Sequence, residues 1–296
     1  MTRGEALKSL ATGAALLALG AAGSKTHAHA PLTRKTAMIK PDLKGNINHS
    51  VCRWCYRDIA LEDLVLASKD YGLKSVELLW PEEYEVATKH GLTCAISFGS
   101  KLGIVKGFND PAHHEQLLKD FADIIPKAAD HGLTQVICFS GNRGTISDEQ
   151  GIENCAIGLD PVLEIAAKHN IKIVMELLNS KVNHPDYMCD HTEWGVALCE
   201  KVQSENLSLL YDIYHMQIME GDIIATIRKH HKWISHYHTG GVPGRNEIDE
   251  TQELYYPSIM RAIVETGYKG FVGQEFVPKH ADPLVSLQAS IGICDV

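Results

Sequence analysis

Four apolar segments of the chain each end at a residue that can bind a metal ion or move a proton. The four end residues are Glu176, Asp212, His238 and Glu275. Each segment has the length and the apolar character of a buried strand. A carboxylate at the end of a buried strand is costly unless something pairs it. If the four strands deliver their ends to one rim, the resulting set of side chains suits a divalent metal ion.

Three carboxylates and one imidazole form a ligand set that is rich in oxygen. Such a set is unlike a structural zinc site and leaves coordination positions open for substrate, so it predicts Mn2+ or Mg2+, with Co2+ able to substitute. The ion could hold two neighbouring substrate oxygens and stabilise the charge of an enediolate. A carboxylate beside the substrate carbon could then move the proton. Glu176 and Glu275 come from strands far enough apart to flank a substrate from two sides.

Several nearby residues are candidates for orienting a substrate. His215 could hydrogen-bond a substrate oxygen, and Arg245, in a Gly/Pro loop, could clamp a carboxylate through two parallel hydrogen bonds. Asn179 and Gln217 are further candidates for substrate binding. Simpler explanations exist for each: a polar strand end can be a salt-bridged rim residue, His215 a loop histidine that bonds backbone, and Arg245 a surface arginine. The coincidence of four metal-compatible strand ends favours a site.

Strand-like and helix-like segments alternate from about residue 45 onward, as period-2 and helix-period patterns indicate. Strands are predicted at 47–51, 75–79, 93–98, 135–140, 171–176, 207–212, 233–238 and 271–275. Helices are predicted at 61–71, 81–90, 113–131, 149–169, 191–204, 222–231, 256–266 and 284–293.

This alternation predicts an α/β fold, a single parallel (β/α)8 TIM barrel over residues 45–296, since such barrels take about 250 residues. A doubly wound open sheet is the alternative, and it is disfavoured because no Gly-x-Gly-x-x-Gly follows the first strand. Alternate residues of a barrel strand point inward. Val174 should therefore share a face with Glu176, and Leu210 with Asp212.

Residues 1–30 differ in composition from the predicted barrel. Arg3 and Lys8 precede an apolar run at 10–22, and Ala28-His29-Ala30 resembles a small-x-small cleavage site. The pattern predicts a signal peptide, of the Sec type or a degenerate twin-arginine type, followed by a linker at 31–44 and export to the periplasm. A disordered or membrane-anchoring tail is the alternative, and the protein is cytoplasmic if the signal is not used. The apolar run is too short for a confident transmembrane helix, so we expect no stable membrane span in the mature chain.

Charge and cysteine content narrow the class of protein. The formal net charge of -9, from 28 basic and 37 acidic residues, argues against a nucleic-acid partner, because such binding needs a basic face. A small hydroxy-keto acid or a sugar is the expected ligand, and a homo-oligomer stays open.

Most of the eight irregularly spaced cysteines are best explained as buried free thiols. Cys52 and Cys55 have the spacing of a redox motif, and whether they form a disulfide is left open.

Several motifs resemble those of the hydroxypyruvate isomerase family, which belongs to the xylose-isomerase-like TIM barrels. They are Glu176-Leu-Leu-Asn179, Asp212-Ile-Tyr-His-Met-Gln217, His236-Tyr-His238, Val242-Pro-Gly-Arg245 and Gly273-Gln-Glu275-Phe. The resemblance covers roughly residues 46–278. It implies that Glu176, Asp212, His238 and Glu275 bind the metal, that Glu176 and Glu275 form the catalytic acid/base pair, and that His215 and Arg245 contact substrate.

The activity implied by the resemblance is the isomerisation of hydroxypyruvate to 2-hydroxy-3-oxopropanoate (tartronate semialdehyde) through an enediolate. Some family members carry glutamine in place of His238, whereas related ketose epimerases carry histidine. A ketose 3-epimerase or sugar isomerase acting on a neutral sugar is therefore an alternative, and the export signal also favours it. A barrel that binds a sugar or acid without turning it over is a third reading, disfavoured because open metal positions beside two glutamates are costly in a passive receptor.

Overall fold

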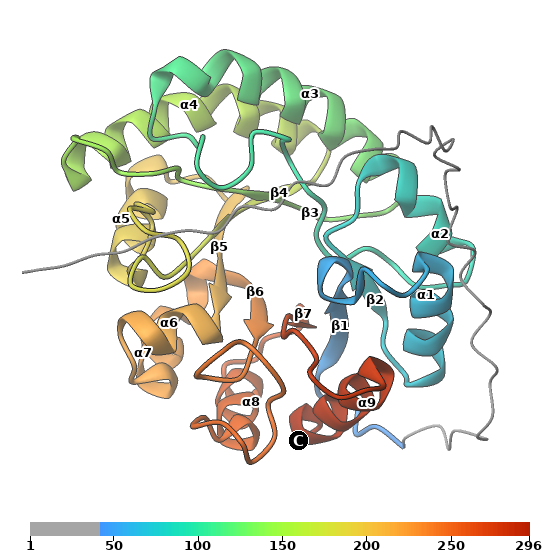
Figure 1. Ribbon diagram of the computed structural model, residues 1–296. Coiled ribbons are helices and arrows are strands. Elements are labelled where there is room, and N and C mark those ends of the chain that lie inside the picture. The colour runs from blue at the N-terminus through green and yellow to red at the C-terminus, as the bar shows by residue number, and fades with distance from the viewer. Residues whose placement is uncertain (1–41) are drawn as a thin grey trace, which may run out of the picture. The chain divides into compact units, whose positions relative to one another are not determined.

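The computed structural model of the protein describes residues 42–296. Its central element is a curled sheet of parallel strands in the order β2-β1-β7-β6-β5-β4-β3, with helices packed on its outer side (Figure 1). The strands are β1 Asn48–Cys52, β2 Ser75–Glu77, β3 Gln135–Cys138, β4 Lys172–Glu176, β5 Leu207–Asp212, β6 Ile234–Thr239 and β7 Phe271–Gln274. Each lies at a predicted strand. The sheet confirms the predicted α/β TIM-barrel class.

The remaining predicted strand, at 93–98, has a less regular form. It makes isolated parallel bridges with both edges of the sheet, pairing Thr93 with Ser75, and Ser97 with Leu79 and Val136. The segment therefore joins β2 to β3 and completes the ring. Backbone hydrogen bonds hold it on both sides, from the N–H of Phe98 to the carbonyl of Leu79 and from the N–H of Ser97 to the carbonyl of Gln135.

The helices also lie where the sequence predicts them, with one addition. They are α1 Leu61–Asp70, α2 Tyr84–Thr88, α3 His114–Asp130, α4 Asp148–Lys168, α5 Thr192–Val202, α6 Ile213–Met219, α7 Ile223–His230, α8 Tyr256–Glu265 and α9 Pro283–Cys294. The helix predicted at 81–90 is shorter, because a 3-10 turn at Pro81–Glu83 precedes α2. Helix α6 was not predicted. It begins directly after β5, because the Asp212 side chain accepts a hydrogen bond from the backbone N–H of His215 and caps the first turn.

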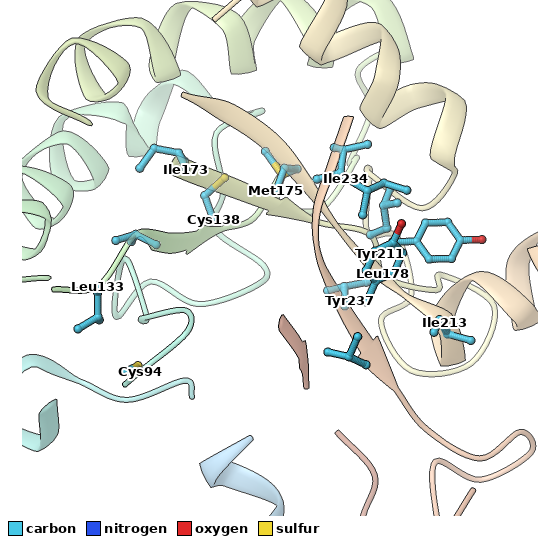
Figure 2. Close-up of a cluster of buried hydrophobic side chains, with 14 of the residues drawn as sticks. Cys94, Leu133, Cys138, Ile173, Met175, Leu178, Tyr211, Ile213, Ile234 and Tyr237 are labelled. Atoms are coloured by element: carbon cyan, nitrogen blue, oxygen red, sulfur yellow. The ribbon is translucent and has the colours of Figure 1, made fainter. Parts of the chain in front are cut away.

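Two buried apolar layers lie on opposite faces of the sheet. The larger one packs the outer face of the strands against the helices, and Figure 2 shows part of it, with Met175 of β4, Tyr211 of β5 and Tyr237 of β6. The smaller one fills the interior of the ring. It consists of Cys52, Leu78, Ile96, Ile137, Val174 and Leu210. Val174 and Leu210 thus face inward as predicted, and they form the apolar floor below the carboxylates that end β4 and β5.

All eight cysteines are free thiols, and Cys52 and Cys55 are not joined. None of the helices within residues 42–296 is long and apolar enough to span a bilayer. The predicted signal peptide at 1–30 lies outside the described residues, as does most of the predicted linker at 31–44.

Candidate active site

The carboxyl ends of four neighbouring strands bring the predicted metal ligands together. Glu176 ends β4, Asp212 ends β5, His238 lies one residue before the end of β6, and Glu275 directly follows β7. All four side chains are buried, and their donor atoms lie within 4.8 Å of one another. The strand register explains the meeting, because Asp212 pairs with His238 across β5 and β6. One rim of the ring therefore carries a compact cluster of three carboxylates and one imidazole.

Within the cluster, a ring nitrogen of His238 faces carboxylate oxygens of Glu176 and Glu275 without forming a hydrogen bond. His238 Nδ1 lies 3.5 Å from Glu176 Oε1 and 2.9 Å from Glu275 Oε2. Among the described residues 42–296, neither His238 Nδ1 nor Glu176 Oε1 has a hydrogen-bond partner, so neither approach is a hydrogen bond. Buried polar atoms are seldom left in this state. Converging oxygen and nitrogen lone pairs are what a divalent cation binds, so these residues fit the predicted metal.

Arg245 lies against the same cluster. Its Nη2 donates to Glu275 Oε2 at 2.5 Å and to Asp212 Oδ2 at 3.2 Å. The guanidinium lies over the rings of Trp54 and Tyr214, at 5.1 and 5.3 Å from their centroids. Trp54 in turn donates from its indole N–H to Glu275 Oε1 at 2.7 Å. Arg245 is therefore part of the buried centre, where its charge offsets part of the charge of the carboxylates.

The two glutamates have different electrostatic surroundings. Burial raises the pKa of Glu176, and the nearby charge of Glu275 raises it further. Burial also raises the pKa of Asp212 well above its ordinary value, although Arg245 opposes this shift. For Glu275 the effect of burial is outweighed by Arg245 and His238, which hold its pKa well below the usual range. Glu275 is thus a stabilised anion, whereas Glu176 is the stronger base of the pair.

His215 is held in one protonation state beside the cluster. Its Nδ1 accepts from the backbone N–H of Asn179 at 3.0 Å and lies 2.6 Å from the Asn179 side-chain amide nitrogen. Burial lowers the pKa of His215 well below its usual value, and the charge of Arg245 lowers it further, so the ring is neutral. The proton therefore sits on Nε2, which lies 3.7 Å from Asp212 Oδ2 and has no hydrogen-bond partner.

The other two predicted substrate-binding residues lie differently. Asn179 is buried and acts on His215 rather than lining the cavity. Gln217 donates to Glu253 at 3.0 Å in an exposed hydrogen bond. Residues two positions apart on a helix point in different directions, so α6 turns Gln217 away when it turns His215 toward the cluster.

A cavity of about 290 Å³ opens over Glu176 and Glu275. Its lining adds residues that the sequence did not point to, among them Trp54, Arg57 and His184. Its other walls are largely apolar and come from Leu78, Phe98, Ile104, Ile137, Phe139 and Leu178. A larger depression of about 780 Å³ lies at the opposite, amino-terminal ends of β3 to β6, away from all the predicted site residues. Barrel enzymes carry their chemistry at the carboxyl ends of the strands, which favours the smaller cavity.

Another residue missed by the sequence analysis is Glu77, at the end of β2. It is fully buried inside the ring, and its Oε1 lies 2.7 Å from His238 Nε2 and 2.9 Å from His236 Nε2. The signal that could have revealed it is a carboxylate within the predicted apolar strand at 75–79, where an uncompensated charge is costly.

Comparisons with known proteins identify the family of the fold. The family model described as "Xylose isomerase-like TIM barrel" matches residues 65–291. A human protein provisionally named a hydroxypyruvate isomerase is 34% identical over 247 residues, which cover 76% of this chain and 87% of that protein. The 2-oxo-tetronate isomerase of Cupriavidus necator is 27% identical over 239 residues, covering 76% of this chain and 90% of its own. Among solved structures, an AP endonuclease of family 2 from Brucella melitensis has a TM-score of 0.74 at 22% identity, covering 81% of this chain and 97% of its own.

Proposed function

Because the chain belongs to the xylose isomerase-like TIM barrel family, we propose that it is a metal-dependent isomerase of small keto acids that interconverts hydroxypyruvate and 2-hydroxy-3-oxopropanoate. The observation that carries the proposal is the buried cluster of Glu176, Asp212, His238 and Glu275 beneath a small cavity. The names of the human and Cupriavidus necator relatives, which are isomerases of hydroxypyruvate and of 2-oxo-tetronate, support the substrate class.

The four clustered residues would hold one divalent ion, Mn2+ or Mg2+, with Co2+ as a substitute. Such an ion supplies Lewis-acid polarisation of the substrate carbonyl. The neutral His215 can hydrogen-bond a substrate oxygen through Nε2–H, because its other ring nitrogen already accepts from Asn179. This fixed donor can orient the oxygen that changes its bonding during the reaction.

Glu176 is the base that we assign to the first proton transfer. The reaction moves one proton from C3 of hydroxypyruvate to C2, and it moves the hydroxyl proton from O3 to O2. Glu176 removes the C3 proton to give an enediolate, since its raised pKa matches it to this task better than the stabilised anion Glu275. Glu275 flanks the substrate from the other strand, and a carboxyl of this pair returns a proton to C2.

The carboxylate of the substrate needs a cation that is free to receive it. Arg245 is already bonded to Asp212 and Glu275. Arg57 is exposed and lines the same cavity, where its guanidinium carbon lies 5.8 Å from the centroid of the Trp54 ring. Within residues 42–296, no carboxylate lies within ion-pair distance of Arg57. We therefore assign the carboxylate contact to Arg57, and we expect Arg245 to touch substrate oxygens near the glutamates.

Solvent exchange tests the proposed reaction. The purified protein should incorporate deuterium from D2O into hydroxypyruvate and should form tartronate semialdehyde, in each case only with Mn2+, Mg2+ or Co2+ present. Absence of exchange with all three ions would overturn the proposal. Exchange into a neutral ketose, with none into hydroxypyruvate, would support the sugar epimerase alternative instead, and tight binding of either compound without exchange would support a passive barrel.

A charge variant separates the keto acid from the neutral sugar as substrate. Arg57→Gln should raise KM for hydroxypyruvate by about 10- to 100-fold, since hydrogen bonds to charged groups contribute about 1.5 to 3 kcal/mol. It should leave KM for a neutral ketose unchanged. The matched control is Lys101→Gln, because Lys101 also lies over an indole, 5.4 Å from the centroid of Trp80, but outside this cavity. Equal losses in the two variants would show that only the overall charge matters.

A further inference from the structure

A second buried polar cluster lies directly behind the metal-ligand set, inside the ring. It consists of Glu77, His236 and the Nε2 side of His238, and none of the three side chains is exposed. One carboxylate oxygen, Glu77 Oε1, contacts both rings, at 2.7 Å from His238 Nε2 and 2.9 Å from His236 Nε2. Glu77 Oε2 has no hydrogen-bond partner. Both imidazoles therefore converge on one oxygen atom.

The carboxylate fixes which ring nitrogen of His238 carries the proton. An ionised carboxylate can only accept hydrogen bonds, so both Nε2 atoms must donate to it. A neutral His238 that donates from Nε2 has an unprotonated Nδ1. That atom is the one that faces Glu176 and Glu275, at 3.5 and 2.9 Å. The lone pair is thus presented to the same space as the ligand oxygens.

The packing around Glu77 is arranged to admit a carboxylate at this position. A Cβ placed on Gly273 would lie 2.3 Å from Glu77 Oε1 and 2.9 Å from His238 Cδ2, so the contact requires glycine on β7. Cys52 closes the remaining side, with its Sγ 3.5 Å from Glu77 Oε1. A fully buried carboxylate is costly unless it is paired, and the two imidazole donors compensate part of that cost.

We propose that Glu77 is a positioning residue for the metal site: by accepting from Nε2, it locks His238 in the tautomer and orientation that make Nδ1 a metal ligand. The role of His238 as a ligand rests on the proposed function, whereas the tautomer does not depend on it. Carboxylates behind ligating histidines orient the ring and raise its basicity, and their loss typically weakens metal affinity by about 10- to 100-fold.

The test combines the tautomer of His238 with metal affinity, and neither measurement needs a substrate. In the metal-free parent, at a pH high enough to make His238 neutral, 15N NMR of labelled histidine should show the remaining ring proton on Nε2 and not on Nδ1. Glu77→Leu should give a mixed or reversed tautomer, and Mn2+ should bind about 10- to 100-fold more weakly in calorimetric titration. Glu77→Gln should keep the Nε2 tautomer, because its amide oxygen still accepts, and it should weaken Mn2+ binding by about 3- to 10-fold.

A matched control removes a different buried carboxylate. Glu247 is also buried, and its Oε1 accepts from Ser286 and from the backbone N–H groups of Lys279 and His280, away from the metal ligands. Glu247→Gln should leave both the His238 tautomer and the Mn2+ affinity at parent values. The proposal is overturned if Glu77→Leu retains the parent tautomer or binds Mn2+ within twofold of the parent. If Glu77→Leu does not fold, Glu77→Gln decides, and unchanged Mn2+ affinity in that variant overturns the proposal.

Discussion

Replacing Glu176 with glutamine should abolish most turnover while leaving the fold intact. Within residues 42–296, Glu176 Oε1 has no hydrogen-bond partner, and it lies 3.5 Å from His238 Nδ1. The substitution therefore breaks no short ion pair. Since burial raises the pKa of Glu176, the ionised side chain is disfavoured in the folded protein, and a neutral amide of the same shape should not lower stability. The melting temperature of metal-free Glu176→Gln should equal or exceed that of the parent.

The loss in rate should then report proton transfer alone. A positioned general base typically contributes about 10²- to 10⁴-fold, which corresponds to about 3 to 5 kcal/mol of activation free energy. The amide oxygen can still bind a metal ion, so Mn2+ affinity should weaken less than turnover does. The assay is kcat for hydroxypyruvate measured against Mn2+ concentration, beside a calorimetric Mn2+ titration of the same protein.

Saturating metal distinguishes the two roles of Glu176. If Glu176 were only a ligand, enough Mn2+ would restore Glu176→Gln to near the parent rate. That result would refute the assignment of Glu176 as the base, even if the metal site itself were correct. A variant that stays slow at saturating Mn2+, but still binds the ion and melts normally, would support it.

Three further predictions concern Asp212, Glu275 and His49. Asp212→Asn should weaken Mn2+ affinity more than it lowers kcat, because Asp212 is proposed only to hold the ion and to cap α6. Excess Mn2+ should therefore partly restore kcat. Glu275→Gln, unlike Glu176→Gln, should lower the free energy of unfolding by about 1.5 to 3 kcal/mol in urea titrations, because it removes a charged hydrogen-bond partner of Arg245 whose ionised form the fold stabilises. Burial lowers the pKa of His49 from 6.5 to about 4. The neutral form of His49 is therefore favoured on folding. Its contribution to the free energy of unfolding should be complete above pH 6.5 and should fall by up to about 3 kcal/mol as the pH drops to 4. His49→Leu should remove this pH dependence in unfolding titrations at several pH values.

The fold could be predicted from the sequence wherever local pattern and final structure agree. The bounds of β5, Leu207–Asp212, match the prediction to the residue, because an apolar run ends there at a charged side chain. The segment at 93–98 was predicted correctly in place but not in regularity, because it pairs with its neighbours through isolated bridges, and that pairing depends on tertiary packing. Helix α6 was missed, because the cap that starts it is the side chain of a residue interpreted only as a metal ligand.

The candidate site, like the fold, could be predicted from the sequence only in part. Strand ends can be predicted to meet, since parallel strands of a closed ring end on one rim. Loop and cross-ring contacts cannot, because they depend on tertiary packing. A loop carries Arg245 to its contacts with Asp212 and Glu275. No local sequence pattern determines the path of that loop. Recognition of α6 would have shown that Gln217 and His215, two positions apart on the helix, point in different directions, and Gln217 bonds Glu253.

From the charges of the site we expect its ligands to bind in a fixed order. The ionised forms of Glu176, Asp212 and Glu275 place three negative charges in a buried space. The guanidinium of Arg245 offsets one of them and a protonated His238 offsets a second, so at least one negative charge is left uncompensated. Burial is the largest cause of the raised pKa values of Glu176 and Asp212, and repulsion from the neighbouring carboxylates raises them further. At an effective dielectric constant of about 20, two like charges about 4 Å apart repel each other by roughly 4 kcal/mol, so an anionic keto acid is disfavoured until a cation neutralises the carboxylates. A divalent ion of the kind that this ligand set fits supplies that neutralisation. The substrate carboxylate would still need its own partner. Since Arg245 is bonded to Asp212 and Glu275, we propose Arg57 for this role, because no carboxylate within residues 42–296 pairs with it at the cavity wall.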